Sequence, residues 1–386
     1  MNRLTTSWGD FPLTRFPADP RDPLRAWDAA DEYLLAHLAE SGTDLSGSVA
    51  VVGDRWGALV TALAAAGAGE LTQISDSYLG RRATGDNLDR SGAAPGAVRL
   101  LTTQDPPPER VDVLLVRVPK SLALLEDQLH RLAPAVHEGT VVVGTGMVKE
   151  IHTSTLKLFE RILGPTRTSL AVKKARLIHT TPAAVEGGRP ANPWPLRYAL
   201  PADAPAGLAG RTVVNQAGVF CADRLDIGTR FLLQHLPTGV GRSRVVDLGC
   251  GNGVVGLAVA LAEPEAELLF TDESYQAVAS AEENFRTLVG DTRTAEFAVG
   301  DGLADLAPGS VDLVLNNPPF HSHHATTDRT ARRMFAEARR ALRPGGELWV
   351  VGNRHLGHHV SLRRIFGNSE LVAGDPKFVV LRAVKR

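Results

Sequence analysis

The chain has 386 residues and a formal net charge of −1, with 42 Lys and Arg residues against 43 Asp and Glu residues. Its length suggests two domains, or three, at about 150 residues each. Its balanced charge excludes RNA binding by overall attraction, so any such contact depends on local basic patches. Only two cysteines, Cys221 and Cys250, and no apolar stretch long enough for a signal peptide or membrane helix predict a cytoplasmic protein without a membrane partner.

Short apolar runs alternate with amphipathic stretches from Ser48 to Val384. This alternation is typical of an α/β fold in which a mostly parallel sheet carries helices on both faces. Residues 182–210 interrupt it with a segment rich in Pro, Gly and Ala, which predicts a linker. We therefore expect one domain over 1–181 and a second over 211–386.

The two halves resemble each other at an offset near 200 residues. SVAVVGDRWG parallels SRVVDLGCGNG, ISDSYLG parallels FTDESYQ, and VDVLLVRVPK parallels VDLVLNNPPF. These matches align Asp76 with Asp272 and Asp112 with Asp312. Their constant order indicates a tandem duplication of one domain.

The two copies differ where a ligand-binding turn is expected. The second copy has DLGCGNG and NNPPF, whereas the first has Gly53-Asp54-Arg55-Trp56-Gly57 and Arg117-Val118-Pro119-Lys120 at the matching places. We interpret the first copy as degenerate and without cofactor.

A glycine-rich turn follows the first predicted strand of the second copy, Arg244 to Leu248, and leads into an apolar helix from Val254 to Ala262. Glycine lets a backbone turn sharply and approach a ligand closely, and the helix start attracts negative groups. The preceding Asp247 can pair with an ammonium group, which S-adenosylmethionine carries and a nicotinamide cofactor lacks at this place. The predicted cofactor contacts are Asp247, Gly249, Cys250, Gly251, Asn252 and Gly253 in this stretch, with Asn317 further along the chain.

Two more acids follow predicted strands. Asp272 closes the strand Leu268 to Thr271, where a carboxylate can accept hydrogen bonds from ribose hydroxyls, although Asp there is as often a helix N-cap. Asp301, next to Gly302, follows the strand Phe297 to Val299 and can accept from an adenine amino group, or belong to a plain turn.

The loop after the strand Val311 to Leu315 carries the predicted chemistry. Asn317 supplies a side-chain carbonyl, and Pro318 and Pro319 remove backbone donors from the loop. The Asn317 and Pro318 carbonyls can accept both hydrogens of an exocyclic amine, while Phe320 stacks on the ring that bears it. The pattern predicts methyl transfer to an amino group on a planar substrate, with Asn317, Pro318, Pro319 and Phe320 as catalytic residues.

These motifs are similar to those of class I "small domain" methyltransferases that use S-adenosylmethionine. NPPFHSHHATTD, RPGGELWVVGNRHLGHH and IHTSTLKLFE resemble the bacterial rRNA guanine-N2 methyltransferases, and GNRHL favours the large-subunit branch over the small-subunit branch. The resemblance implies two tandem Rossmann-like domains, each a seven-stranded sheet closed by an antiparallel hairpin. It implies that the second domain methylates guanine N2 of 23S rRNA and that the first helps to hold RNA. Cys221 and Ala222 stand where this family is expected to have Ser-Arg.

Basic residues near both predicted sites are candidate RNA contacts. An amphipathic helix is predicted over Arg329 to Arg343, with a basic face that can meet phosphates or simply be solvated. His321 can line the base pocket or reach a phosphate. The histidines lack thiolate neighbours and regular spacing, so no metal is expected. The candidate contacts are Lys120, Lys173, Lys174, Arg176, His321, Arg332, Arg333 and Arg340.

Other activities remain open from the residues alone. The same loop serves adenine N6, a protein glutamine amide or a guanine of 16S rRNA. The chain shows neither Tyr in place of Phe320, expected for a protein-amide enzyme, nor an added recognition domain, expected for a DNA enzyme. A non-catalytic RNA-binding assembly factor is the alternative of another class.

Overall fold

The computed structural model describes residues 3–19, 23–184, 188–205, 207–290, 293–319 and 324–386. The chain forms two compact units, Met1–Trp194 and Pro195–Arg386. The range 182–210, predicted as a linker, divides between them and contains strand β10 (Leu196–Ala199), which pairs antiparallel with β11 (Thr212–Asn215). Four residues between proline-rich segments are too short a strand to stand out in the sequence.

The first unit holds a seven-stranded sheet in the order β5-β4-β3-β6-β7-β9-β8. A short antiparallel hairpin of β1 (Leu4–Thr6) and β2 (Gly9–Phe11) precedes it. The elements that follow are α1 (Ala29–Ser41), β3 (Ser48–Val52), α2 (Ala58–Ala65), β4 (Glu70–Ser75), α3 (Tyr78–Arg90), β5 (Arg99–Thr102), β6 (Val111–Arg117), α4 (Leu122–Leu132), η1 (Ala133–Ala135), β7 (Val136–Met147), η2 (Val148–Glu150), α5 (Thr153–Ile162), β8 (Thr166–Thr168) and β9 (Ala175–Thr180).

The second unit holds a sheet in the order β14-β13-β12-β15-β16-β18-β17. After the β10–β11 hairpin its elements are α6 (Ile227–Leu233), β12 (Arg244–Leu248), α7 (Val254–Ala262), β13 (Glu267–Asp272), α8 (Tyr275–Val289), β14 (Glu296–Val299), β15 (Val311–Asn316), α9 (His324–Ala341), β16 (Leu342–Asn353), η3 (Arg354–Leu356), α10 (His358–Phe366), β17 (Glu370–Gly374) and β18 (Phe378–Val384).

The two sheets have the same topology, which confirms the predicted duplication. Strands pair in parallel except at the last two positions, where β9 and β18 run antiparallel to both neighbours. Even an irregularity is shared, because the register shifts between Val111 and Val113 in one sheet and between Val311 and Leu313 in the other. The hairpin predicted at the chain's end is β17–β18.

The register corrects one predicted equivalence. Ser48 pairs with Glu70 in the first sheet, and Arg244 pairs with Glu267 in the second. Counting along the strands therefore places Ser75 at the position of Asp272, one residue before Asp76. The carboxylate that closes β13 has no counterpart in the first unit.

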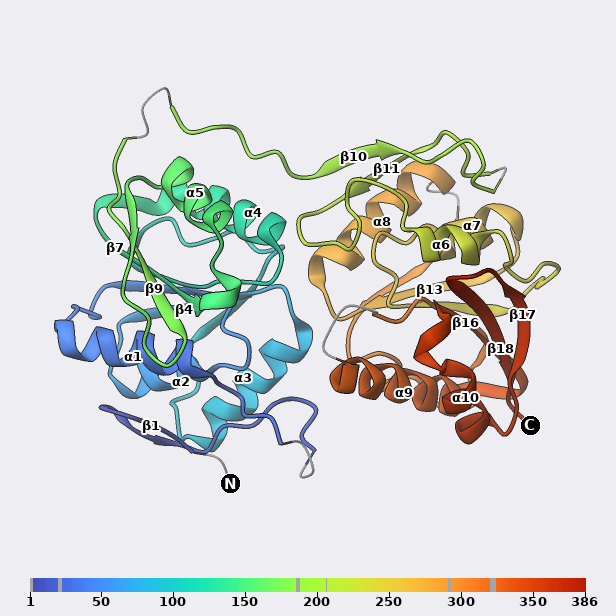
Figure 1. The fold of residues 1–386 in the computed structure, drawn as a ribbon, viewed down its shortest axis with the longest axis horizontal. Coiled ribbons are helices and arrows are strands. Elements are labelled where there is room, and N and C mark those ends of the chain that lie inside the picture. Colours follow the sequence, from blue (N-terminus) through green and yellow to red (C-terminus); the bar gives the residue numbers. More distant parts are fainter. Residues whose placement is uncertain (1–2, 20–22, 185–187, 206, 291–292, 320–323) are drawn as a thin grey trace. The chain divides into compact units, whose positions relative to one another are not determined.

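Helices cover both faces of each sheet (Figure 1), and alternate residues of the central strands pack in different cores. In β3, Val49 and Val51 pack in a core with α1 and α2, while Ala50 and Val52 pack in a core with α4 and α5. In the second unit Val245 belongs to the core under α7 and α8 and Val246 to the core over α9 and α10. Strands buried on both faces explain the continuous apolar runs of the sequence.

Helix starts in both units use the same devices. The serines Ser77, Ser121 and Ser274 cap α3, α4 and α8 through their side chains, and Asp28 and Asp226 cap α1 and α6.

Helix α9 begins five residues before the predicted start and ends two before the predicted end, since Leu342 already belongs to β16. No described helix is long and apolar enough to cross a membrane.

Close packing of α7 on the sheet leaves no room for a side chain at Gly256. A Cβ added to Gly256 of α7 would lie 2.3 Å from Cε1 of Phe270, whose ring stacks on Phe297 and meets the edge of Phe285. We expect Gly256→Ala to lower the free energy of unfolding by about 1–3 kcal/mol through overpacking, measured by urea unfolding. The matched control is Gly85→Ala in α3, where an added Cβ meets nothing within 4 Å. It should raise stability by about 0.5–1 kcal/mol, and destabilisation by both variants would contradict this explanation.

Candidate active site

The glycine-rich turn after β12 is held close to β13 and leaves space on one side. Gly249, Gly251 and Gly253 all have positive φ, at 71°, 53° and 80°, which glycine adopts without strain. The amides of Gly249 and Cys250 both donate to the Thr271 carbonyl. A Cβ at Gly253 would lie 2.9 Å from Ala281, whereas one at Gly251 would meet nothing within 4 Å. The turn is therefore closed towards α8 and open at Gly251.

The neighbouring side chains of this turn are mainly structural. Asn252 is buried, donates to Asn215 Oδ1 at 2.9 Å and accepts from the Val254 amide at 3.3 Å. Cys250 is buried too, and burial raises the pKa of its thiol well above its ordinary value. Gly253 caps α7 without a side-chain hydrogen bond. Two other side chains accept at the start of α7 instead: Asn252 from the Val254 amide and Asp247 from the Gly256 amide.

Asp247 is a buried carboxylate under the turn. It is 3% exposed and accepts a hydrogen bond from the Gly256 amide at 2.8 Å. Burial raises its pKa to about 7, although the Gly256 amide opposes the shift. A carboxylate in this state gains from a cation placed beside it, because the cation favours the charged form.

Asp272 ties the end of β13 to the turn. Its carboxylate accepts from the Gly251 amide at 3.1 Å and from the Ser274 amide at 3.0 Å. Ser274 is the residue that caps α8, so the N-cap alternative for Asp272 is wrong. Burial raises the pKa of Asp272, against the lowering effect of the backbone amides of Ser274, Gly251 and Glu273.

The loop after β14 is fastened to α9. Asp301 accepts from Arg333 Nη1 at 2.7 Å, and Glu337 accepts from the Leu303 amide at 3.0 Å. A Cβ on Gly302 would lie 2.3 Å from Glu337 Oε2, so this glycine permits the close approach. Arg340 Nη2 donates to the Ala304 carbonyl at 3.0 Å. Of the residues predicted to contact RNA, Arg333 and Arg340 therefore bind within the unit, while Arg332 is exposed.

The loop after β15 presents the amide predicted to act. Asn316 is fully buried and donates from Nδ2 to the Leu248 carbonyl at 2.8 Å, which joins the ends of β15 and β12. Asn317 donates from Nδ2 to Thr229 Oγ1 at 2.8 Å. Its Oδ1 is buried and accepts no hydrogen bond from any described residue. Pro318 is buried and Pro319 exposed, whereas Phe320 and His321 lie outside the described residues.

Strand pairing brings the turn and the loop together. β12 pairs with both β13 and β15, and Leu248 is opposite Asn316. The connections after β12 and β15 lead to opposite faces of the sheet, so this edge is the switch point where α/β proteins bind ligands. Asp247, Gly251, Asp272 and Asn317 all lie at this edge.

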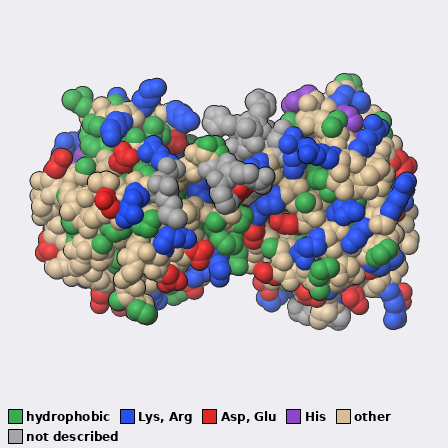
Figure 2. Space-filling model, turned by 90° about the horizontal axis from the view of Figure 1, so that it is seen from below, with side chains coloured by type: hydrophobic (Ala, Val, Ile, Leu, Met, Phe, Trp, Pro, Cys, Tyr) green, Lys and Arg blue, Asp and Glu red, His purple; other side chains and the backbone are tan. Residues whose placement is uncertain are grey.

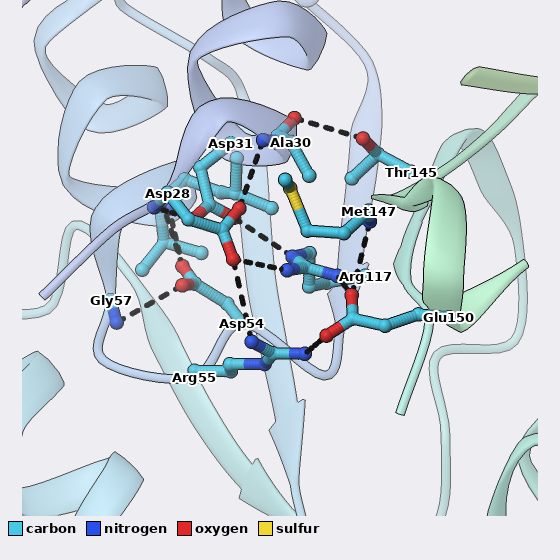
Figure 3. A network of polar contacts seen from close by, with 12 residues as sticks. Asp28, Ala30, Asp31, Asp54, Arg55, Gly57, Arg117, Thr145, Met147 and Glu150 are labelled. Atoms are coloured by element: carbon cyan, nitrogen blue, oxygen red, sulfur yellow. Dashed lines mark hydrogen bonds and ion pairs between the residues drawn. The ribbon is translucent and has the colours of Figure 1, made fainter. Parts of the chain in front are cut away.

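The equivalent place in the first unit is filled by a network of charges, drawn in Figure 3. Ala50 pairs with Leu114 as Val246 pairs with Val314, which puts Arg117 at the position of Asn317. The Arg117 side chain is fully buried and contacts Asp28 at 2.7 Å, Asp31 at 3.2 Å and Glu150 at 3.0 Å.

These ion pairs favour the charged forms of Arg117 and Glu150 despite their burial. Burial would lower the pKa of Arg117, but Asp31, Asp28 and Glu150 outweigh it and raise that pKa. Burial would likewise raise the pKa of Glu150, but Arg117 and Arg55 lower it to about 2. Arg55, at the position of Gly251, donates to Glu150 at 2.9 Å.

A second substitution closes the helix start in the first unit. Asp54, at the position of Cys250, is 1% exposed and accepts from the amides of Leu59 at 2.9 Å and Val60 at 3.0 Å. The N-terminus of α2 is thus occupied by a carboxylate of the chain itself. A helix start satisfied in this way no longer attracts an external anion.

The remaining basic candidates lie on the first unit's surface. Lys120 is exposed, and Lys173 and Lys174 are exposed in a turn with positive φ. Lys173 pairs with Glu32 at 3.1 Å, and Arg176 is half-buried. Figure 2 shows Lys and Arg side chains interspersed with Asp and Glu over one face of each unit. No group of His, Cys, Asp and Glu among the described residues is arranged to hold a metal ion.

Thr229, the partner of Asn317, is not among the residues that the sequence predicts for the site. Thr229 is the third residue of α6, and the helix cap Asp226 accepts from its amide at 2.9 Å. The available signal was the LDIGT segment, in which an Asp precedes a Thr by three residues as in a helix cap. Nothing in it indicates a contact with a residue 88 positions later.

Comparison with known proteins covers both units. Residues 1–184 match the family described as "RLMG N-terminal domain", and residues 210–382 match "Methyltransferase small domain". A ribosomal RNA large subunit methyltransferase G from Streptomyces avermitilis is 73% identical over 99% of both chains. The protein of that name from Stutzerimonas stutzeri is 47% identical over 99% of both chains.

A solved structure shares the whole architecture. It is a 16S rRNA N2 methyltransferase from T. thermophilus in complex with AdoMet and guanosine. It aligns with 100% of this chain and 98% of its own, at a TM-score of 0.74 and 21% identity. This likeness shows that the two-unit fold is shared.

The buried charge network predicts a large stability effect. Replacing Arg117 by Met should destabilise the first unit by about 3–5 kcal/mol, because three carboxylates lose their buried partner. The control is Arg161→Met, whose half-exposed guanidinium pairs with Glu126 at the surface and should change stability by less than about 1 kcal/mol. Chemical unfolding measures both; equal effects would show that Arg117 contributes no more than a surface pair.

Proposed function

The chain belongs to the ribosomal RNA large subunit methyltransferase G family, and from this premise we propose that it methylates the exocyclic N2 amino group of a guanine in 23S rRNA. S-adenosylmethionine is the proposed methyl donor. Relatives that carry the family name span 99% or more of this chain. Their name favours large-subunit RNA over 16S rRNA, DNA or a protein amide as substrate.

The observation that carries the proposal is the buried, unpartnered Oδ1 of Asn317 at the switch point. A buried acceptor without a partner costs free energy, so its retention in this place favours a ligand with a hydrogen-bond donor. The two hydrogens of an exocyclic amine fit Oδ1 and the Pro318 carbonyl. This pairing directs the nitrogen lone pair away from both oxygens.

The residues at the turn fit the proposed cofactor. Asp247 is placed to pair with the ammonium of the methionine part, Gly251 faces open space, and Asp272 keeps acceptor capacity for ribose hydroxyls beyond its two backbone bonds. Asp301 and Gly302 lie at the next strand end, where adenine would bind. When bound, S-adenosylmethionine supplies an activated methyl group, so the protein contributes mainly orientation.

The chain's own residues do the remaining work. Asn317 and Pro318 hold the amine, which becomes acidic only after it has gained the methyl group and then releases a proton to water. No strong general base is required. The first unit, with Arg117 and Asp54 in the places of Asn317 and Cys250, supports RNA binding without cofactor.

The central test is methylation of isolated rRNA. The protein is incubated with labelled S-adenosylmethionine and 16S and 23S rRNA from cells that lack it, and the modified nucleoside is identified by mass spectrometry. We expect N2-methylguanosine in 23S rRNA. Asn317→Ala should be slower by about 100-fold, the order seen when one preorganised group is removed. Methylation of adenine or of protein alone would contradict the proposal.

Cofactor affinity should rise with pH. Because the pKa of Asp247 lies at about 7 rather than at 3.8, the carboxylate is mostly neutral at pH 6 and mostly charged at pH 7.5. An ammonium with a pKa near 8 pairs only with the charged form, so affinity should increase by about fivefold across this range. Isothermal titration at each pH measures it.

The control ligand is methylthioadenosine, which lacks the ammonium. Its affinity should stay flat over the same range, and so should the affinity of Asp247→Asn for S-adenosylmethionine. An equal pH slope for both ligands would assign the effect to another group.

A further inference from the structure

A three-residue hydrogen-bond chain ends on Asn317. Asp226 Oδ2 accepts from the Thr229 hydroxyl at 3.3 Å, and Thr229 Oγ1 accepts from Asn317 Nδ2 at 2.8 Å. The cap residue Asp226 also accepts from the Thr229 amide at 2.9 Å. Thr229 is 7% exposed, so its hydroxyl has little access to water.

We propose that Thr229 is a positioning residue for the reaction, because it fixes which end of the Asn317 amide faces the substrate amine. The inference rests on the proposed function and names a residue that acts through Asn317. Thr229 itself does not need to touch substrate or cofactor.

The donor and acceptor roles along these hydrogen bonds decide which end of the Asn317 amide faces the substrate. A hydroxyl has one proton and two acceptor sites, and Asp226 Oδ2 accepts from both the amide and the hydroxyl of Thr229. Thr229 therefore donates to Asp226 and is left as an acceptor towards Asn317. Only the NH2 end of the amide satisfies it, so the carbonyl end points the other way and stays unpartnered.

The reverse orientation would disable the site. The two ends of an Asn side chain have nearly the same shape, and hydrogen bonding alone decides between them. With the amide turned round, the NH2 group of Asn317 would face the NH2 group of guanine, and two donors do not bond. Thr229 is thus the group that selects the competent orientation.

An equivalent contact in the first unit gives independent support for the positioning role of Thr229. Asp28 caps α1 as Asp226 caps α6, and Asp31 is the third helical residue as Thr229 is. There Arg117 Nε donates to Asp31 Oδ1 at 3.2 Å. Both units therefore share a contact between this helix position and the carboxyl end of the equivalent strand, where Arg117 ends β6 and Asn317 directly follows β15. In the second unit it joins two neutral groups and leaves one carbonyl unpaired.

The test compares Thr229→Val with Thr229→Ser. Valine keeps the shape of threonine and the backbone amide that Asp226 caps, but it has no acceptor; serine keeps the hydroxyl. For Thr229→Val we expect kcat on rRNA to fall by about tenfold or more, with the KM for RNA and the Kd for S-adenosylmethionine within about threefold of wild type. Thr229→Ser should retain kcat within about threefold.

A double-mutant cycle with Asn317→Asp tests whether Thr229 acts by orienting the side chain at position 317 or by general structural support of the site. A carboxylate presents an oxygen whichever way it is turned, so Thr229 has no orientation to select in that background. Adding Thr229→Val to Asn317→Asp should therefore lower kcat by less than about threefold. A cost as large as in the wild-type background would overturn the inference.

The remaining outcomes distinguish this inference from the proposed function. If wild type makes no N2-methylguanosine, the proposed function itself fails. If it does, and Thr229→Val keeps kcat within twofold of wild type or Thr229→Ser loses as much as Thr229→Val, the positioning role alone is overturned. Unfolding midpoints of the variants, compared with wild type, show that a lower kcat does not reflect a smaller folded fraction.

Discussion

The parallel pairing of β12 with β15 is the contact on which the candidate site depends. It sets Leu248 opposite Asn316, and the Asn316 amide locks the two strand ends by donating to the Leu248 carbonyl. The glycine-rich turn and the Asn317 loop therefore start side by side although they are far apart in the sequence. A shift of one residue in this register would turn Asn317 to the other face of the sheet. The proposed chemistry thus follows from an ordinary strand ladder.

The same ladder in the first unit shows how little must change to lose such a site. Arg117 replaces Asn317 and Asp54 replaces Cys250, and both are buried. A buried guanidinium requires partners, which Asp28, Asp31 and Glu150 supply. The helix start that could meet a ligand is satisfied by Asp54. The scaffold is kept while the two charged groups at these positions, Arg117 and Asp54, are paired within the chain.

The fold could be predicted from the sequence because its signals are local and repeated: apolar runs, glycine turns and an offset near 200 residues. The position of Asp247, Asp272 and Asn317 at strand ends could be predicted for the same reason. Long-range contacts could not. The ion pair of Arg333 with Asp301, the Thr229–Asn317 bond and the network around Arg117 join residues 32, 88 and up to 89 positions apart. The alignment of Asp76 with Asp272 is wrong because it rests on residue identity alone. The strand register places Ser75 at the position of Asp272.

Helix α9 connects the two halves of the candidate site. It begins at His324, soon after the Asn317 loop, and its side chains hold the loop after β14: Arg333 binds Asp301, and Glu337 accepts from the Leu303 amide. Burial raises the pKa of Glu337, against the lowering effect of the Leu303 amide. The contact between Glu337 and this amide is therefore partly shielded from water. The same helix therefore fixes the loop at the proposed adenine site. Basic residues of α9 thus serve the internal geometry of the site as well as the surface.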